Sequence, residues 1–211
     1  MNFRTLLAVC FLAAVLAGPV KASGVYDEII QAANNNDTAR VISLLRRGMD
    51  VNTVDRQGNS LLMIAARGNN VELVRFLLGN RANPERRNPY GDTALMLAAM
   101  QGHAATVSAI LERKPELNHA GWTALHYAAF SGHEDVLALL IAAGADIDLK
   151  APNGETALML AARNGHFQTV RVLAGARADP SVRSIEGKTA LDIAREAGHR
   201  EIAVFLERFG G

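Results

Sequence analysis

The stretch GWTALHYAAFSGH at residues 121–133 decides the fold, because its pattern returns at regular intervals along the 211-residue chain. Five short strings share a glycine, one variable residue, a Ser or Thr, and a leucine two positions later. Their glycines are Gly58, Gly91, Gly121, Gly154 and Gly187. These glycines lie 33, 30, 33 and 33 residues apart, and self-similarity at such a period indicates repeated structural units that stack side by side.

Each repeat continues with an alanine-rich segment and then a second apolar segment. Between the two, four repeats carry a Gly-His pair and one carries Asn69-Asn70; glycine and asparagine both favour the left-handed conformation that ends a helix. The second segment places apolar residues at helical spacing, as in the range 136–141. We therefore predict two short helices in every repeat. The Gly-His pairs are Gly102-His103, Gly132-His133, Gly165-His166 and Gly198-His199.

This pattern resembles the ankyrin repeat over residues 25–209. The resemblance implies an all-α fold, a solenoid of stacked helix-turn-helix units with β-turn fingers. Because one helix pair cannot bury its apolar face alone, the units should share one continuous core. Polar residues in the first and last units indicate that both are caps. The expected units are residues 25–54, 55–87, 88–120, 121–150, 151–183 and 184–211.

The N-terminus has the features of a secretory signal peptide. Arg4 gives a positive start, residues 5–17 are apolar but short for a membrane span, and residues 20–22 fit a small-x-small cleavage site. We predict cleavage after Ala22, which leaves an ankyrin-repeat domain at residues 23–211. A retained signal anchor is the alternative. Signal peptides on ankyrin-repeat proteins point to exported bacterial members, so we expect a periplasmic or secreted protein with no membrane association after cleavage.

Composition and motifs argue against several classes of function. The chain has 22 Lys and Arg against 21 Asp and Glu, and a nucleic-acid-binding protein would normally show a basic excess. Cys10 is the only cysteine, so the mature chain would have no disulfide or thiol chemistry. The string at residues 186–189 resembles part of a phosphate-binding loop, but Val182 stands where that loop needs glycine. We expect no enzyme activity, catalytic residue or cofactor.

The recurrent histidines raise the possibility of a metal site. Residues at equivalent positions of stacked units should lie about 8–10 Å apart, whereas metal ligands all lie about 2.0–2.3 Å from one ion. We therefore expect no metal at His103, His133, His166 and His199. The resemblance implies instead that these side chains, and His126 in the Thr-x-x-His position, make structural hydrogen bonds.

The resemblance places partner contacts on the fingertips and on the exposed face of each first helix. The partner-binding residues expected there are Tyr90, Met100, Gln101, Trp122, Phe130, Asn153, Arg163 and Asn164. Four of them, Tyr90, Met100, Trp122 and Phe130, should form one exposed apolar patch, which is typical of a binding hot spot. The fourth unit is three residues short before Gly121, so Trp122 and Phe130 could instead cover a truncated finger.

We expect the chain to be a monomeric scaffold, chaperone-like partner or inhibitor of another protein. The exported ankyrin-repeat subgroup suggests two partner classes, namely an enzyme of oxidative-stress defence such as a catalase, or a toxic effector that is neutralised by binding. Nothing in the residues separates these two. The alternative function is that of a small-molecule or metal-binding periplasmic protein.

Overall fold

The computed structural model describes residues 18–210, with side chains from residue 24. Most of the expected signal peptide, residues 1–22, therefore lies outside the described residues, and the expected cleavage site after Ala22 falls in helix α2 (Gly18–Asn34). None of the helices in the described part of the chain combines the length and apolar character that a membrane span requires.

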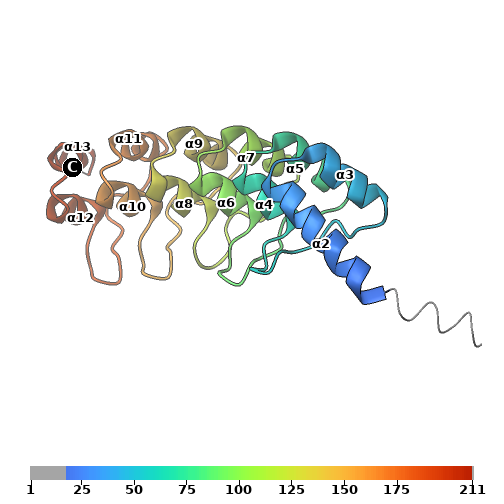
Figure 1. The fold of residues 1–211 in the computed structure, drawn as a ribbon. Helices are drawn as coiled ribbons and strands as arrows, with labels where there is room; N and C mark the ends of the chain where they lie inside the picture. The colour runs from blue at the N-terminus through green and yellow to red at the C-terminus, as the bar shows by residue number, and fades with distance from the viewer. Residues whose placement is uncertain (1–17, 211) are drawn as a thin grey trace, which may run out of the picture.

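The described residues form an all-α solenoid, as the sequence predicted (Figure 1). Besides the helices, residues 18–210 contain one isolated β-bridge, between Val54 and Ser60. The inner layer consists of α2 (Gly18–Asn34), α4 (Leu61–Arg67), α6 (Ala94–Met100), α8 (Ala124–Ser131), α10 (Ala157–Arg163) and α12 (Ala190–Glu196). The outer layer consists of α3 (Thr38–Arg46), α5 (Val71–Gly79), α7 (Ala104–Leu111), α9 (Glu134–Ala142), α11 (Phe167–Gly175) and α13 (Arg200–Phe209).

The same two signals begin and end the inner helices from α4 to α12. Each begins after a Ser or Thr whose hydroxyl oxygen accepts a hydrogen bond from the backbone N–H three residues later, an interaction that satisfies one free N–H of the first turn. These residues are Ser60, Thr93, Thr123, Thr156 and Thr189. The chain then reverses at a left-handed residue, which is Gly132 after α8 (φ 77°) and Asn69 after α4 (φ 53°). The Asn-Asn pair thus replaces Gly-His as predicted.

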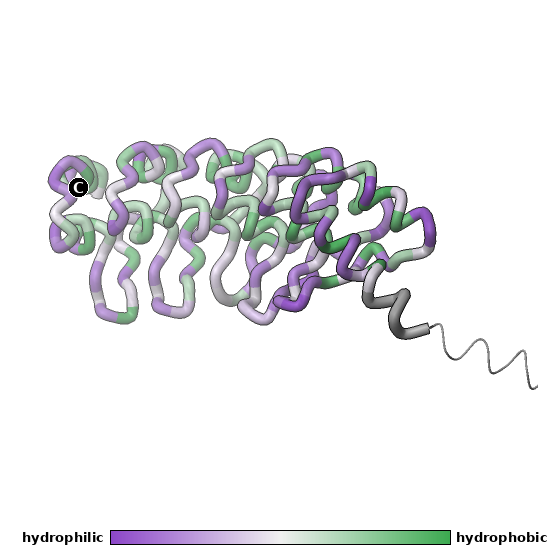
Figure 2. The backbone as a smooth tube through the Cα atoms, in the orientation of Figure 1, coloured by the Kyte–Doolittle hydropathy of each residue, from purple (hydrophilic) through white to green (hydrophobic). Residues whose placement is uncertain are grey.

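Alanines allow the inner helices to pack closely. In α6 every residue from Ala94 to Ala99 is buried, and α6 lies against both α4 and α8. Leucine, isoleucine and valine of the outer helices fill the space behind them, so one core runs the length of the array. Figure 2 shows the apolar segments concentrated in the two helical layers and the hydrophilic segments mainly in the loops.

Four fingers have the same backbone closure. In each, an N–H donates to the carbonyl four residues later, in the pairs Asp55–Asn59, Asn88–Asp92, Ala151–Glu155 and Ser184–Lys188, at 2.8, 3.0, 2.9 and 2.9 Å. The finger before α8 has no equivalent bond within residues 118–122. The bond to the next unit is kept there, since Oδ1 of Asn118 accepts from the N–H of Asp146 at 2.8 Å, as Asn52 and Asp148 do in their units. The three-residue deletion therefore removes the regular tip of this finger.

Candidate protein-binding face

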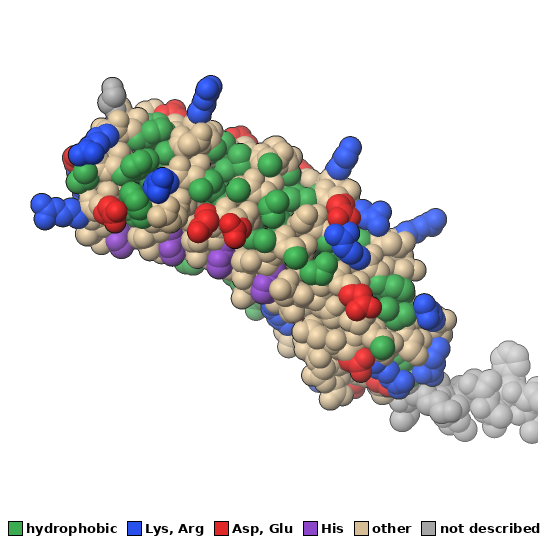
Figure 3. Space-filling model, turned by 90° about the horizontal axis from the view of Figure 1, so that it is seen from above, with side chains coloured by type: hydrophobic (Ala, Val, Ile, Leu, Met, Phe, Trp, Pro, Cys, Tyr) green, Lys and Arg blue, Asp and Glu red, His purple; other side chains and the backbone are tan. Residues whose placement is uncertain are grey.

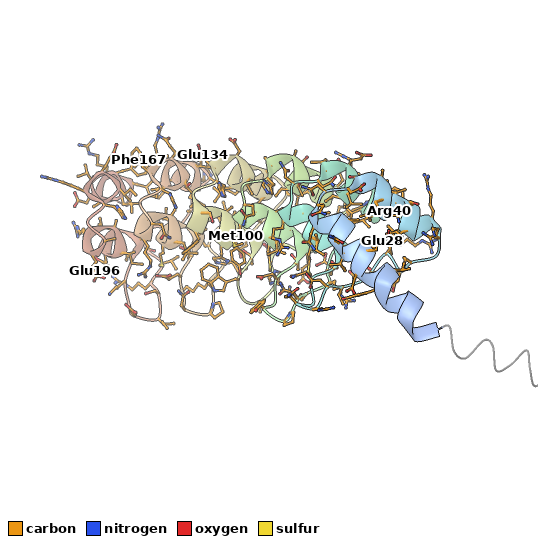
Figure 4. All side chains as sticks on the ribbon, in the orientation of Figure 1. Glu28, Arg40, Met100, Glu134, Phe167 and Glu196 are labelled. Carbon is orange, nitrogen blue, oxygen red and sulfur yellow. The ribbon has the colours of Figure 1, made fainter. Side chains whose placement is uncertain are left out.

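The inner helices and the fingers together form one side of the array, which we call the finger face. All eight residues expected to bind a partner belong to the inner helices, their C-terminal caps or the fingers. In Figure 4, Met100 lies in the layer of the inner helices, whereas Glu134 and Phe167 lie in the outer layer. Side chains of the finger face thus come from different units but share one surface.

Four aromatic rings gather where the short finger meets α8. The ring of Trp122 lies 5.9 Å from the ring of His126, 5.5 Å from that of Tyr127 and 6.3 Å from that of Phe130, measured between centroids. The contacts with His126 and Phe130 are edge-to-face, a geometry that aromatic pairs prefer. This cluster, the Trp122 cluster, fixes the orientation of Phe130, which remains 46% exposed.

The expectation of one exposed apolar patch is wrong for two of its four residues. Tyr90 is 83% exposed and Phe130 is 46% exposed, but Trp122 and Met100 are half-buried and pack against the core. The ring of Trp122 packs over α8, and the residue after the turn glycine is half-buried or buried in the other fingers as well, at Asn59, Asp92, Glu155 and Lys188. Trp122 therefore orients Phe130 through an edge-to-face contact, and its coverage of the short finger stays a prediction.

Tyr127 is a contributor to this face that sequence reasoning missed. Its hydroxyl donates to Oδ1 of Asp92 in the preceding finger at 2.7 Å. Burial, followed by the neighbouring Asp92 carboxylate, raises the pKa of Tyr127 to about 12, so the hydroxyl stays protonated as the donor. The bond joins α8 to the third finger, next to the Trp122 cluster. A tyrosine immediately after the Thr-x-x-His position was the available signal.

The C-terminal part of the finger face is polar and largely satisfied from within. Arg163 forms an ion pair with Glu155, whose side chain is only 5% exposed. Asn153 donates to the same carboxylate at 2.7 Å, and the amide of Asn164 donates to the carbonyl of Leu160 in its own helix at 2.9 Å. These three expected partner-binding residues therefore already have partners in the chain, whereas Gln101 is exposed on the finger face.

The four recurrent histidines form a ladder of bonds between units. In each case Nε2 lies within hydrogen-bond distance of the carbonyl oxygen of the last residue of an inner helix, or the residue next to it, in the preceding unit. The pairs are His103–Arg67, His133–Met100, His166–Phe130 and His199–Arg163, at 3.1, 3.1, 2.9 and 3.0 Å. Figure 3 shows a row of histidine side chains along one edge of the molecule. The structural role implied by the resemblance is confirmed.

His126 has a different structural role inside the fourth unit. Its Nδ1 accepts from the N–H of Thr123 at 3.1 Å, so Nε2 carries the proton that it donates to the carbonyl of Leu149 at 2.9 Å. Burial lowers the pKa of His126 below its ordinary value. Within residues 24–210, no three His, Cys, Asp or Glu side chains are grouped so that they could hold a metal ion.

Comparison with known proteins gives consistent matches. The family model "Ankyrin repeats (3 copies)" matches residues 29–119, 62–151 and 139–208. The solved structure of EF0377, an ankyrin repeat protein, superposes with a TM-score of 0.78 at 32% identity, and the match covers 86% of this chain and 96% of that one.

Curated relatives are similar over part of their length. The palmitoyltransferase AKR1 of Lachancea kluyveri is 32% identical over 53% of this chain and 16% of its own. The transient receptor potential cation channel subfamily A member 1 homolog of Caenorhabditis elegans is 33% identical over 48% and 8%. NF-kappa-B inhibitor alpha of Homo sapiens is 34% identical over 43% and 32%. The similarity therefore spans a third or less of each of these relatives.

Proposed function

Because the chain belongs to the ankyrin-repeat family, we propose that it is a non-catalytic scaffold that binds another protein through its finger face. Ankyrin repeats indicate a protein–protein interaction scaffold, since stacked units present a long surface made of many short elements. The proposed binding centre is the middle of the finger face, from the third to the fourth unit. Met100 and Gln101, the last residue and the C-cap of α6, belong to this part of the face.

The observation that carries this proposal is the exposure of Tyr90 and Phe130. Both rings present apolar surface to solvent, at 83% and 46% exposure, although the core of the array has abundant buried apolar positions. Exposed aromatic side chains on a rigid support are typical binding anchors, because they gain contact area without losing much conformational freedom. The Trp122 cluster supplies that rigid support for Phe130.

The proposal includes export and a regulatory role. The signal-like residues 1–22 support a periplasmic location, where the mature chain would act as a monomeric scaffold, chaperone-like partner or inhibitor. An oxidative-stress enzyme and a toxic effector are the two partner classes that we propose to test first.

The test begins with partner capture on the mature chain from cross-linked periplasmic extract, followed by affinity measurements with the identified protein. Truncating both Tyr90 and Phe130 to alanine should weaken binding by at least about thirtyfold, the effect of losing roughly 2 kcal/mol at a hot spot. Val204→Ala is the matched control, since Val204 is 41% exposed but belongs to outer helix α13.

Two outcomes would count against this function. Unchanged affinity in the Tyr90 and Phe130 variant, or an equal loss in Val204→Ala, would place the binding surface elsewhere. Elemental analysis of the purified protein provides the second check, and we expect no stoichiometric Zn, Cu or Fe. One bound metal ion per chain would favour the metal-binding alternative.

A further inference from the structure

Exposed cations are concentrated at the third fingertip. In the last two fingers Arg163 meets Glu155, and Lys188 lies 3.0 Å from Glu186 and 2.7 Å from Glu196, which leaves Lys150 and Arg183 as single exposed cations with no ion pair among residues 24–210. In the third finger, Arg86 and Arg87 are exposed, and neither is within ion-pair distance of a carboxylate among residues 24–210. The positive charge of this fingertip is therefore directed to solvent.

The carboxylates closest in sequence do not neutralise these arginines. Oε1 of Glu85 accepts from the backbone N–H of Glu116 in the next finger at 3.0 Å. Oδ1 of Asp92 accepts from the hydroxyl of Tyr127, and the segment 86–91 itself contains no acidic residue. One nitrogen of Arg87 donates to the carbonyl of Gly91 at 2.8 Å, which holds its guanidinium at the tip and leaves other N–H groups available.

The preceding finger extends the basic surface. Asn88 donates to Oδ1 of Asn59 at 3.1 Å, and the ring of Pro89 packs so closely on Gly58 that a Cβ there would lie 2.7 Å from it. The two fingers are therefore in direct contact. The second fingertip carries Arg56, whose side chain is 80% exposed and whose 3.4 Å ion pair with Asp27, itself 57% exposed, contributes little.

Tyr90 stands among these cations. The tip thus combines an aromatic ring, 83% exposed, with guanidinium groups from two touching fingers. Arginine binds carboxylates through paired N–H donors, and tyrosine and arginine are both enriched at binding hot spots. A protein segment that matches this surface would carry carboxylates on either side of an apolar residue.

We propose that the second and third fingertips bind an acidic segment of the partner protein, with its carboxylates on Arg56, Arg86 and Arg87 and an apolar side chain on Tyr90. This inference rests on the proposed function and specifies the chemistry of the partner.

The experiment is selection of a random phage-displayed peptide library on the mature chain. The charge-reversed variant carries Arg86→Glu and Arg87→Glu. The matched control carries Arg171→Glu and Arg208→Glu, because both residues are exposed on outer helices, in α11 and α13, and belong to no ion pair among the described residues. Both double variants change the charge equally, and thermal melting verifies that each one folds.

Peptides selected on the wild type and on the control should be rich in Asp and Glu around an apolar residue. The charge-reversed variant should abolish this preference and lower the affinity for the selected peptides by at least about tenfold. This loss of affinity should shrink as the salt concentration rises, because salt screens exposed charges. If the charge-reversed double variant does not fold, peptide affinity is measured on the single variant Arg86→Gln instead.

Selected peptides without an acidic excess, or no enriched peptide at all, would overturn the inference. Equal weakening by the fingertip and control variants would do the same. The proposed function is tested separately by Tyr90 and Phe130. If truncating them leaves affinity for the selected peptides unchanged while the arginine variant weakens it, the carboxylate contacts stand and the placement of an apolar side chain on Tyr90 is wrong.

Discussion

Replacing Gly132 with alanine tests the contact by which one repeat packs on the next. Gly132 follows α8 at a φ of 77°, and a Cβ placed there would lie 2.5 Å from Nδ1 and 2.7 Å from Cγ of His166. Gly198 has the same φ at the equivalent position of the last unit, and a Cβ there would meet nothing within 4 Å. The two substitutions therefore share a backbone cost, and only Gly132→Ala disturbs a neighbouring unit.

The difference between them can be worked out from the contacts. A left-handed alanine costs about 1–2 kcal/mol at either position. At Gly132 the His166 ring must also move, which gives up its 2.9 Å hydrogen bond to Phe130, worth about 1 kcal/mol, and adds overpacking of about 1–3 kcal/mol. We expect Gly132→Ala to lower the free energy of unfolding by about 2 kcal/mol more than Gly198→Ala, or about 4–8 °C in Tm.

Urea unfolding and thermal melting, followed by far-ultraviolet circular dichroism, measure both variants on the mature chain. A third variant combines Gly132→Ala with His166→Ala, and it should lose less stability than the two single changes together, because the ring that clashes is gone. Equal losses at Gly132 and Gly198, or strictly additive losses in the double variant, would refute the reasoning that the histidine ring sits on the preceding glycine.

Two further predictions concern His126 and the N-terminus. Because burial lowers the pKa of His126, the unfolded chain binds more protons than the folded chain, so the free energy of unfolding should fall as pH drops below about 6.5. His126→Gln should flatten this part of the Tm–pH curve, and an unchanged slope would contradict the assignment. N-terminal sequencing of the protein from its native host should start at Ser23, whereas an intact Met1 on soluble cytosolic protein would remove the periplasmic proposal.

The sequence predicted the fold well because its signals are local. Thr123 and Gly132 mark the two ends of α8 through bonds and backbone angles that depend only on nearby residues. For the histidine ladder, the sequence predicted structural hydrogen bonds but not their acceptors. The acceptor for His166 is a backbone oxygen in the preceding unit, at Phe130.

The candidate site was harder to predict, because it depends on how fingers bend over helices. The direction of the Trp122 ring depends on its packing against His126, Tyr127 and Phe130, which the repeat pattern does not specify. Pairing of Arg163 with Glu155 requires the fifth finger to fold back beside its own helix, so a residue expected to face a partner is partly neutralised instead. The exposure of Tyr90 was predicted correctly, because this residue lies at a fingertip under either interpretation of the short finger.

The histidine ladder has a consequence for how such a chain can change its length. Each rung joins a Gly-His pair only to the unit before it, and the same pair recurs at Gly132-His133 and Gly165-His166. Excising residues 133–165 would join Gly132 to His166 and recreate an existing junction, with the histidine facing the carbonyl of Met100. Whole units can therefore be gained or lost with their rungs intact, while the three-residue deletion before Gly121 shows that a finger can shorten without breaking the rungs at His133 and His166.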